Sequence, residues 1–108
     1  MASEPGLERH EWETEWEELQ EELEASPGEA LPALDSLIAR MLEARGYAVE
    51  DEVVGDATEP EVLAEYRAAR EVAQRLDAGE EVDPGDVASA VNGFRALYET
   101  LIVERSAP

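Results

Sequence analysis

The sequence predicts an all-α fold, a single small bundle of about four helices. Apolar residues recur every three or four positions in four stretches, which is the spacing of a helix with one buried face. Proline, glycine and capping residues separate the stretches. We expect helices at about residues 8–25, 27–46, 60–78 and 84–104. They would form one helical domain at residues 8–105, after a flexible lead at residues 1–7.

The first helix is expected to carry a narrow hydrophobic stripe on a surface that is otherwise nearly all glutamate. The stripe consists of Trp12, Trp16, Leu19 and Leu23, at spacings of 4, 3 and 4 residues. The helix should end at Ser26-Pro27-Gly28, because proline has no amide hydrogen and glycine favours turns. Ser26 and Glu29 also match a capping box, so the same residues can end one helix and begin the next.

The second helix is expected to present one apolar face and to end at Gly46, which follows Arg45 as a C-terminal cap would. The apolar face comprises Leu31, Leu34, Leu37, Ile38, Met41 and Leu42. Pro32 conflicts with this pattern, because proline inside a helix removes a backbone hydrogen bond and kinks the axis. We therefore expect either that the helix begins near Leu31 or that its first turn is bent.

The last two helices should form an antiparallel hairpin, because only about five residues separate them. Thr58 and Glu61 match a capping box around Pro60, and Asp83 and Pro84 mark the start of the fourth helix. The fourth helix has the cleanest apolar stripe of the chain, which comprises Val87, Ala90, Val91, Phe94, Leu97, Tyr98, Leu101 and Ile102.

Residues 47–59 are expected to form an ordered loop, which overlaps a candidate calcium site. Counted from Glu50, glycine stands at the sixth position and Glu61 at the twelfth, as in the loop of an EF-hand. The oxygen-bearing residues at positions 1, 3, 7, 9 and 12 are Glu50, Glu52, Asp56, Thr58 and Glu61. Val54 occupies position 5, where an oxygen ligand is needed. We therefore favour a helix cap and a turn that share this spacing, and keep calcium binding as an alternative.

The chain is strongly acidic, with 28 acidic residues against 8 basic ones and a net charge of −20 in 108 residues. Such a charge opposes binding to nucleic-acid phosphates and to anionic membranes. A solvated glutamate surface is the plainest explanation, and the alternatives are nucleic-acid mimicry, salt adaptation or docking to a basic protein. No apolar run is long enough to span a membrane, so we expect a cytoplasmic protein with no membrane contact.

The residue types that build most active sites are scarce. Cysteine and lysine are absent and His10 is the only histidine, so thiolate chemistry and Walker-type phosphate binding are excluded. A serine triad would have to use His10, and no serine lies in a nucleophile-elbow sequence. Di-iron centres in helical bundles need two Glu-x-x-His pairs, which this sequence does not contain. We predict a protein that is not an enzyme and needs no cofactor.

The stripe of Trp12, Trp16, Leu19 and Leu23 is the strongest candidate for a partner-binding surface, because tryptophan dominates many interfaces. Such a stripe more often packs within its own chain, and it also suits a coiled-coil dimer. We interpret the chain as a protein-protein interaction or self-association module whose partner is another protein or a second copy. Calcium binding and nucleic-acid mimicry are the alternatives.

Three blocks of residues in the first, second and last helices share the spacing of a known pattern. They are Trp16, Leu19 and Gln20; Pro27, Ala30, Leu34, Asp35, Leu37 and Ile38; and Asp86, Val87, Ala90, Phe94, Arg95, Leu97, Tyr98, Leu101 and Ile102. In these blocks the chain resembles small acidic helical actinobacterial proteins of unassigned function, whose pattern runs Trp-x-x-Ile-Gln, Pro-x-x-Ala, Ala-Asp-x-Leu-Val and Tyr-Arg-x-Phe-Phe. Residues 43–62 and Pro32 depart from that pattern. The resemblance implies a helical interaction domain and transfers no catalytic residue.

Overall fold

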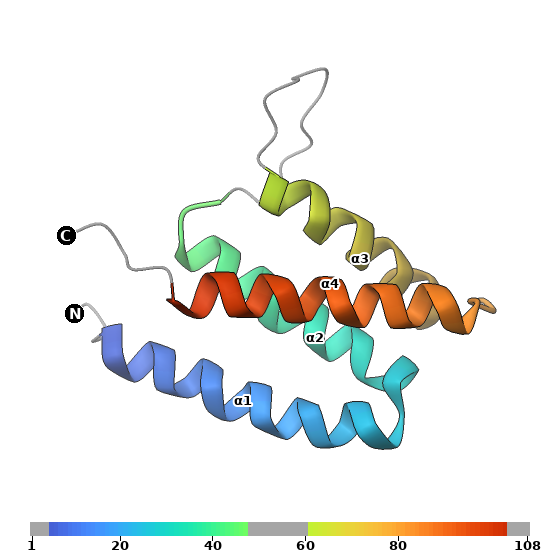
Figure 1. Cartoon of the computed structure of the whole chain (residues 1–108), viewed down its shortest axis with the longest axis horizontal. Coiled ribbons are helices and arrows are strands. Elements are labelled where there is room, and N and C mark those ends of the chain that lie inside the picture. The colour runs from blue at the N-terminus through green and yellow to red at the C-terminus, as the bar shows by residue number, and fades with distance from the viewer. Residues whose placement is uncertain (1–4, 48–60, 104–108) are drawn as a thin grey trace.

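The computed structural model describes residues 5–47 and 61–103, which form four α-helices (Figure 1). They are α1 (Pro5–Ala25), α2 (Pro27–Ala44), α3 (Glu61–Asp77) and α4 (Pro84–Val103). No strand occurs in these described ranges, and the expected small all-α bundle is confirmed. α1 begins at Pro5, three residues before the expected start, because proline is well suited to the first helical position. Residues 5–7 are therefore helical, and residues 1–4 of the expected lead lie outside the described residues.

α2 is the central helix of the bundle. It packs along α1, α3 and α4, and Figure 1 shows it behind α4, with α1 on one side and α3 on the other. Its fully buried residues are Ala30, Leu31, Leu34, Leu37, Ile38, Met41 and Leu42. A helix that neighbours cover on several sides needs an apolar surface wider than a single stripe. The leucine-rich sequence of α2 supplies that surface.

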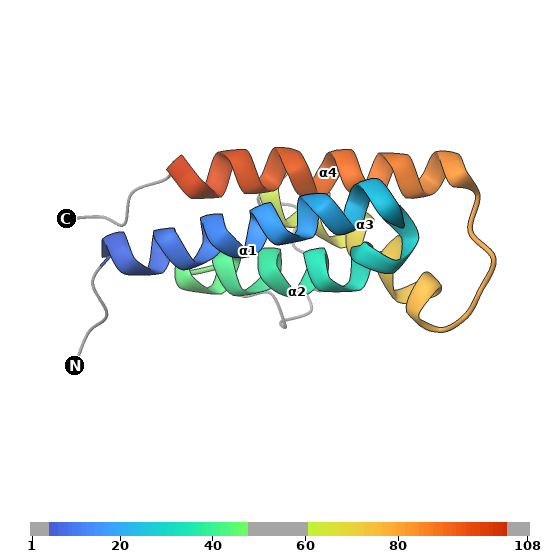
Figure 2. The ribbon, with the colours of Figure 1, turned by 90° about the horizontal axis from the view of Figure 1, so that it is seen from below.

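α3 and α4 form the expected antiparallel hairpin and pack closely along each other (Figure 1). Small residues face each other between the two helices, and a Cβ atom built on Gly93 would lie in ordinary contact with the Cβ atom of Ala69, at 3.6 Å. α1 and α4 also run in opposite directions, as Figure 2 shows, but they do not pack along their lengths. α1 packs on α2, whereas α4 packs on both α2 and α3, which leaves a boundary between α1 and α4 at the surface.

α2 and α3 end in the same way, at a glycine in the left-handed region. Gly46 has a φ of 96° and Gly79 a φ of 82°, values that side-chain-bearing residues rarely adopt. After α2, the amides of Gly46 and its successor donate to the carbonyls of Glu43 and Leu42, each at 3.0 Å. The same Schellman arrangement follows α3, so both ends have their last carbonyls satisfied.

The starts of α2 and α4 share a proline-glycine sequence but differ in their caps. At α4, Oδ1 of Asp83 accepts a hydrogen bond from the Gly85 amide at 3.1 Å. At α2, the Ser26 side chain makes no capping hydrogen bond, so the expected side-chain contact of the capping box is wrong. The ψ of 83° at Ser26 lies below the range typical of a capping residue. The Ser26 amide instead donates to the Glu22 carbonyl at 2.7 Å, which closes α1.

Pro32 lies inside α2, five residues after its first residue. α2 begins at Pro27, as in the expected range 27–46, so the alternative start near Leu31 is excluded. Proline removes a single backbone hydrogen bond, the one to the residue four positions earlier, which here is Gly28. Burial of the leucine-rich face along three neighbouring helices outweighs that loss.

Candidate functional site

The hydrophobic stripe of α1 packs into the bundle. Trp12, Leu19 and Leu23 are buried, with 6%, 7% and 6% of their surface exposed, and Trp16 is partly buried against the same core. These four side chains therefore pack within the chain, which is one of the uses that the sequence left open. Their direct use by a partner stays a prediction.

Trp16 and Tyr98 join α1 to α4 at one end of their boundary. The two rings are stacked, with centroids 4.1 Å apart and planes 4° from parallel. Burial raises the pKa of the Tyr98 hydroxyl, because a phenolate is poorly solvated there, and the nearby Glu13 carboxylate raises it further. The neutral phenol is therefore the form that suits this position.

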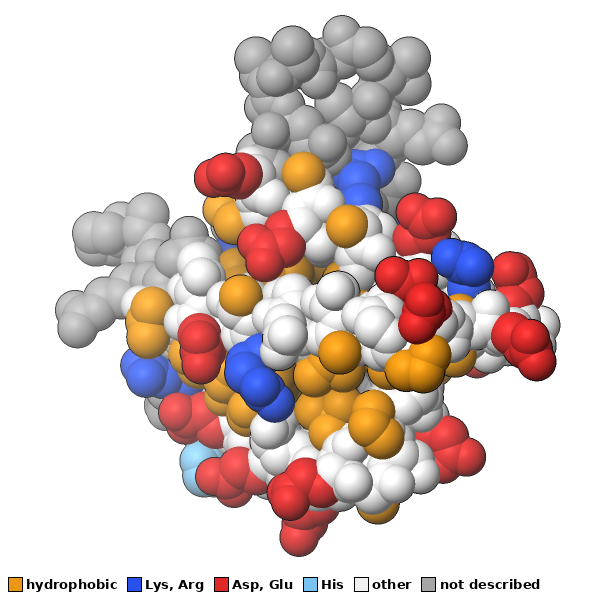
Figure 3. Space-filling view, turned by 45° about the vertical axis from the view of Figure 1, so that its right-hand side comes forward, with side chains coloured by type: hydrophobic (Ala, Val, Ile, Leu, Met, Phe, Trp, Pro, Cys, Tyr) orange, Lys and Arg blue, Asp and Glu red, His pale blue; other side chains and the backbone are white. Residues whose placement is uncertain are grey.

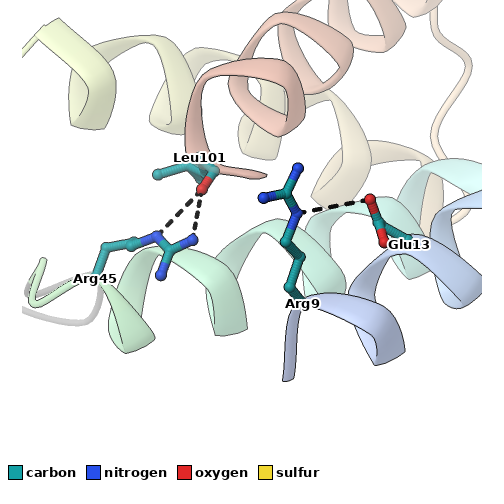
Figure 4. Close-up of polar contacts among 4 residues, drawn as sticks. All are labelled: Arg9, Glu13, Arg45 and Leu101. Carbon is teal, nitrogen blue, oxygen red and sulfur yellow. Dashed lines mark hydrogen bonds and ion pairs between the residues drawn. The ribbon is translucent and has the colours of Figure 1, made fainter. Parts of the chain in front are cut away.

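Arg45 connects three helices at the same end. Its Nε and Nη2 atoms donate to the Leu101 carbonyl of α4 at 3.1 and 2.8 Å (Figure 4). That carbonyl lies in the last turn of α4, where no intrahelical amide reaches it. The guanidinium also lies 5.1 Å from the ring centroid of Trp12 in α1, within cation-π range. We refer to Trp12, Trp16, Arg45 and Tyr98 as the aromatic end.

A groove of about 530 Å³ opens between α1 and α4 on the other side of this contact. We refer to it as the α1–α4 groove. Its α4 wall consists of Pro84, Val87, Ala88, Val91, Asn92 and Arg95. The opposite wall consists of Gln20, Leu23, Glu24, Pro27 and Gly28. Figure 3 shows hydrophobic side chains gathered on this face with acidic side chains around them.

The groove exists because side chains become smaller along α4. At the aromatic end, Tyr98 is large enough to reach Trp16 across the boundary. Toward the start of α4, the residues on this side are Val91, Ala88 and Val87, which cannot fill the same space. Val87 and Val91 stay half-buried as a result. A groove with a partly open apolar wall is characteristic of binding sites.

Three polar side chains line the groove near the aromatic end. Nε2 of Gln20 is buried and has no hydrogen-bond partner among the residues that the structure describes. Arg95 is exposed and forms no ion pair within the described ranges, and the exposed Asn92 lies one turn from it. A buried donor without a partner is unusual in a folded protein, because its desolvation is uncompensated. An acceptor supplied by a bound molecule would satisfy Gln20.

The α1 side of the groove is strongly acidic. α1 contains nine glutamates and one arginine, Arg9, which lies 3.6 Å from Glu13 (Figure 4). Glu24 lines the groove, and Glu17 and Glu21 follow it at helical spacing on the same side of α1, all three exposed. The groove is therefore apolar along its floor, negative along one edge and positive at Arg95.

The calcium alternative falls mostly outside the described residues. Glu50, Glu52, Asp56 and Thr58 lie there, as does the expected loop at 48–59, while Glu61 is exposed at the start of α3. Within the described residues, no group of three or more histidine, cysteine, aspartate or glutamate side chains is placed to hold a metal. His10, the only histidine, is exposed on α1.

No protein-family model, curated protein or solved structure matches this chain. The resemblance to acidic actinobacterial proteins stays a prediction. Within residues 5–47 and 61–103, no helix has the length and apolar character needed to cross a membrane.

Sequence reasoning missed the groove because it assigned Val87 and Val91 to the core stripe of α4. The buried residues of that helix are Ala90, Phe94, Leu97, Tyr98, Leu101 and Ile102. At about 100° per residue, Val87 and Val91 fall within the arc of α4 between the buried Leu97 and Ile102, so the width of the stripe gives no separate signal. The groove is distinguished from the core by the side chains that face α4 from α1, and the sequence alone does not show which side chains those are. Arg45 was read only as part of a helix end, because its contacts lie on two other helices.

Proposed function

We propose that this chain is a non-enzymatic helical domain that binds another protein through the α1–α4 groove. One observation carries the proposal: the half-buried Val87 and Val91 form a partly open apolar wall of the groove, which the unpartnered buried amide of Gln20 also lines. An apolar surface with a few convergent polar groups is typical of a binding site. Leu23 belongs both to the stripe of α1 and to this groove, which connects the proposal to that stripe.

The composition of the groove supports binding rather than catalysis. Its described lining contains no histidine, cysteine or serine, so neither a nucleophile nor an imidazole base is available there. Glu24 and Arg95 are the charged groups of the lining. Such a lining can hold an apolar segment in place, and it offers little for bond-breaking chemistry.

The net charge favours another protein over a second copy. Two copies, each with a charge of −20, repel each other, whereas a basic partner is attracted and steered toward the acidic edge. We therefore interpret the domain as monomeric by itself and bound to a basic protein in the cell.

Site-specific photo-crosslinking in the source cells tests the proposal. A benzophenone amino acid replaces Ala88 in the groove or, as the matched control, Ala96, which is also exposed on α4 but does not line the groove. We expect one discrete crosslinked protein from position 88 and none from position 96. Equal crosslinking from both positions would show binding by surface charge at large, as nucleic-acid mimicry would use. No crosslink from position 88 would contradict the proposal.

A further inference from the structure

We propose that the α1–α4 groove receives a short amphipathic helix of a basic partner protein, with the C-terminal end of that helix at Gln20 and Arg95. This inference rests on the proposed function and specifies the chemistry of the partner. Three features of the groove lead to it: the length and composition of its walls, the charge of its α1 edge, and the position of its unpartnered donors.

The walls of the groove suit a helix. The α4 wall extends from Pro84 to Arg95, a helical rise of about 16 Å, which three turns of a second helix would match. Both walls present side chains from helices, not the open backbone edge of a sheet. An extended peptide would leave its amides and carbonyls unpaired there, whereas a helix satisfies its own. Its apolar face would cover Leu23, Val87 and Val91.

The α1 edge of the groove selects basic side chains. Glu17, Glu21 and Glu24 lie on one side of α1, are exposed, and follow the direction of the groove. Lysine or arginine residues along one edge of the incoming helix pair with them. A second copy of this chain brings nine glutamates in its own α1 and is repelled from the same edge.

The donors near the aromatic end set the direction of the partner helix. The last carbonyls of a helix lack intrahelical partners and carry a partial negative charge. Nε2 of Gln20 and the guanidinium of Arg95 are donors that line this part of the groove. The C-terminal carbonyls of the partner helix accept from these groups. The partner helix therefore runs in the same direction as α4 and opposite to α1.

Designed peptides of about 14 residues, long enough for three turns with short flanks, test this inference on the full chain. The first peptide has leucine at helical spacing and lysine along one edge. The second carries glutamate in place of each lysine, and the third has a central proline that breaks the helix. Affinities are measured by isothermal titration calorimetry, and the bound residues are mapped by amide chemical shifts.

We expect the basic helical peptide to bind in the groove, and the acidic and proline-containing peptides to bind at least about tenfold more weakly. Ala88→Glu places a carboxylate and extra bulk in the groove and should lower the affinity at least about tenfold, whereas Ala96→Glu on the same helix should leave it within about twofold. Val91→Glu is a second groove variant, and thermal unfolding of every variant confirms that it is folded.

The outcomes separate this inference from the proposed function. If the acidic or the proline-containing peptide shifts groove residues as strongly as the basic helix does, the groove binds segments but the basic-helix inference is overturned. If no peptide shifts groove residues, the inference is also overturned, while crosslinking at position 88 decides the proposed function independently. If Ala88→Glu and Ala96→Glu both leave the affinity of the basic peptide unchanged or raise it equally, charge alone drives its binding and the basic-helix inference is overturned.

A nitroxide attached to one end of the basic peptide tests the direction. A label at the C-terminus should broaden the amide signals of Gln20 and Arg95 more than that of Val82, which lines the other end of the groove. A label at the N-terminus should do the reverse. The opposite pattern would overturn the assigned direction.

Discussion

The boundary between α1 and α4 has two parts, the aromatic end and the α1–α4 groove. The apolar stripe of α1 extends through both parts but has different surroundings in each. At the aromatic end, Trp16 stacks on Tyr98, and the Arg45 guanidinium fills the space between Trp12 and the Leu101 carbonyl. In the groove, the α4 wall contains the smaller side chains Val87, Ala88 and Val91, and the Gln20 amide nitrogen has no partner in the described structure. The difference teaches that an apolar stripe on a helix becomes core where large side chains face it, and becomes a binding surface where the side chains that face it are small.

Replacing Trp12 should produce the largest loss of stability and would break the aromatic end. Trp12→Ala should lower the free energy of unfolding by about 3–5 kcal/mol, because it leaves a large cavity and removes the ring beneath Arg45. Urea denaturation measures the change, with the exposed Thr14→Ala as the control in the same helix. A loss below about 1 kcal/mol would show that Trp12 does not belong to the core.

The same substitution at two positions of α1 compares the two parts directly. Leu19 and Leu23 are about equally buried, but only Leu23 lines the groove. Leu19→Ala should cost about 3–4 kcal/mol and Leu23→Ala about 2 kcal/mol, because the space left at Leu23 joins an existing opening and creates less enclosed cavity. Chemical denaturation of both variants tests this difference. Equal losses would mean that the groove is closed in solution.

Two arginines, Arg40 in α2 and Arg45 directly after it, allow a half-buried contact to be compared with an exposed one. Arg45→Ala should cost about 1.5–3 kcal/mol, because the Leu101 carbonyl loses a charged donor in a half-buried place. Arg40→Ala should cost less than about 1 kcal/mol, since the Arg40 ion pair with Glu15 is exposed. Thermal and urea unfolding provide the comparison. If Arg40→Ala proved the more damaging variant, the role assigned to Arg45 would be wrong.

Tyr98 should give the smallest effect, visible only at alkaline pH. Its pKa is raised in the folded chain, so the unfolded chain loses the phenolic proton first and ionisation favours unfolding. The contribution of the neutral Tyr98 side chain to the free energy of unfolding is therefore fully present below about pH 10, the ordinary tyrosine pKa. It is lost as the pH rises through the pKa of Tyr98 in the folded chain. Melting temperatures between about pH 8 and 12 should fall more steeply for the wild type than for Tyr98→Phe. If the melting temperatures of the wild type and of Tyr98→Phe fell equally with pH, the raised pKa assigned to Tyr98 would be wrong.

Much of the fold could be predicted from the sequence, because helix ends are local. Gly46 stops α2 through its own positive φ, and Asp83 starts α4 through a hydrogen bond to an amide two residues away. The side-chain cap at Ser26 was misjudged, and the effect of Pro32 was left open, for the converse reason. Burial along neighbouring helices carries α2 through Pro32, and the tight junction with α1 turns the Ser26 backbone away from a capping geometry.

The amino-acid sequence by itself determined four amphipathic helices, their ends, and the strong negative charge of α1, because these depend on neighbours within about one helical turn. Only the tertiary structure decided that Trp16 meets Tyr98, that Arg45 reaches α1 and α4, and that Val87 and Val91 line a groove. These outcomes depend on which side chains from distant parts of the chain oppose each other and on whether their volumes fill the space between two helices.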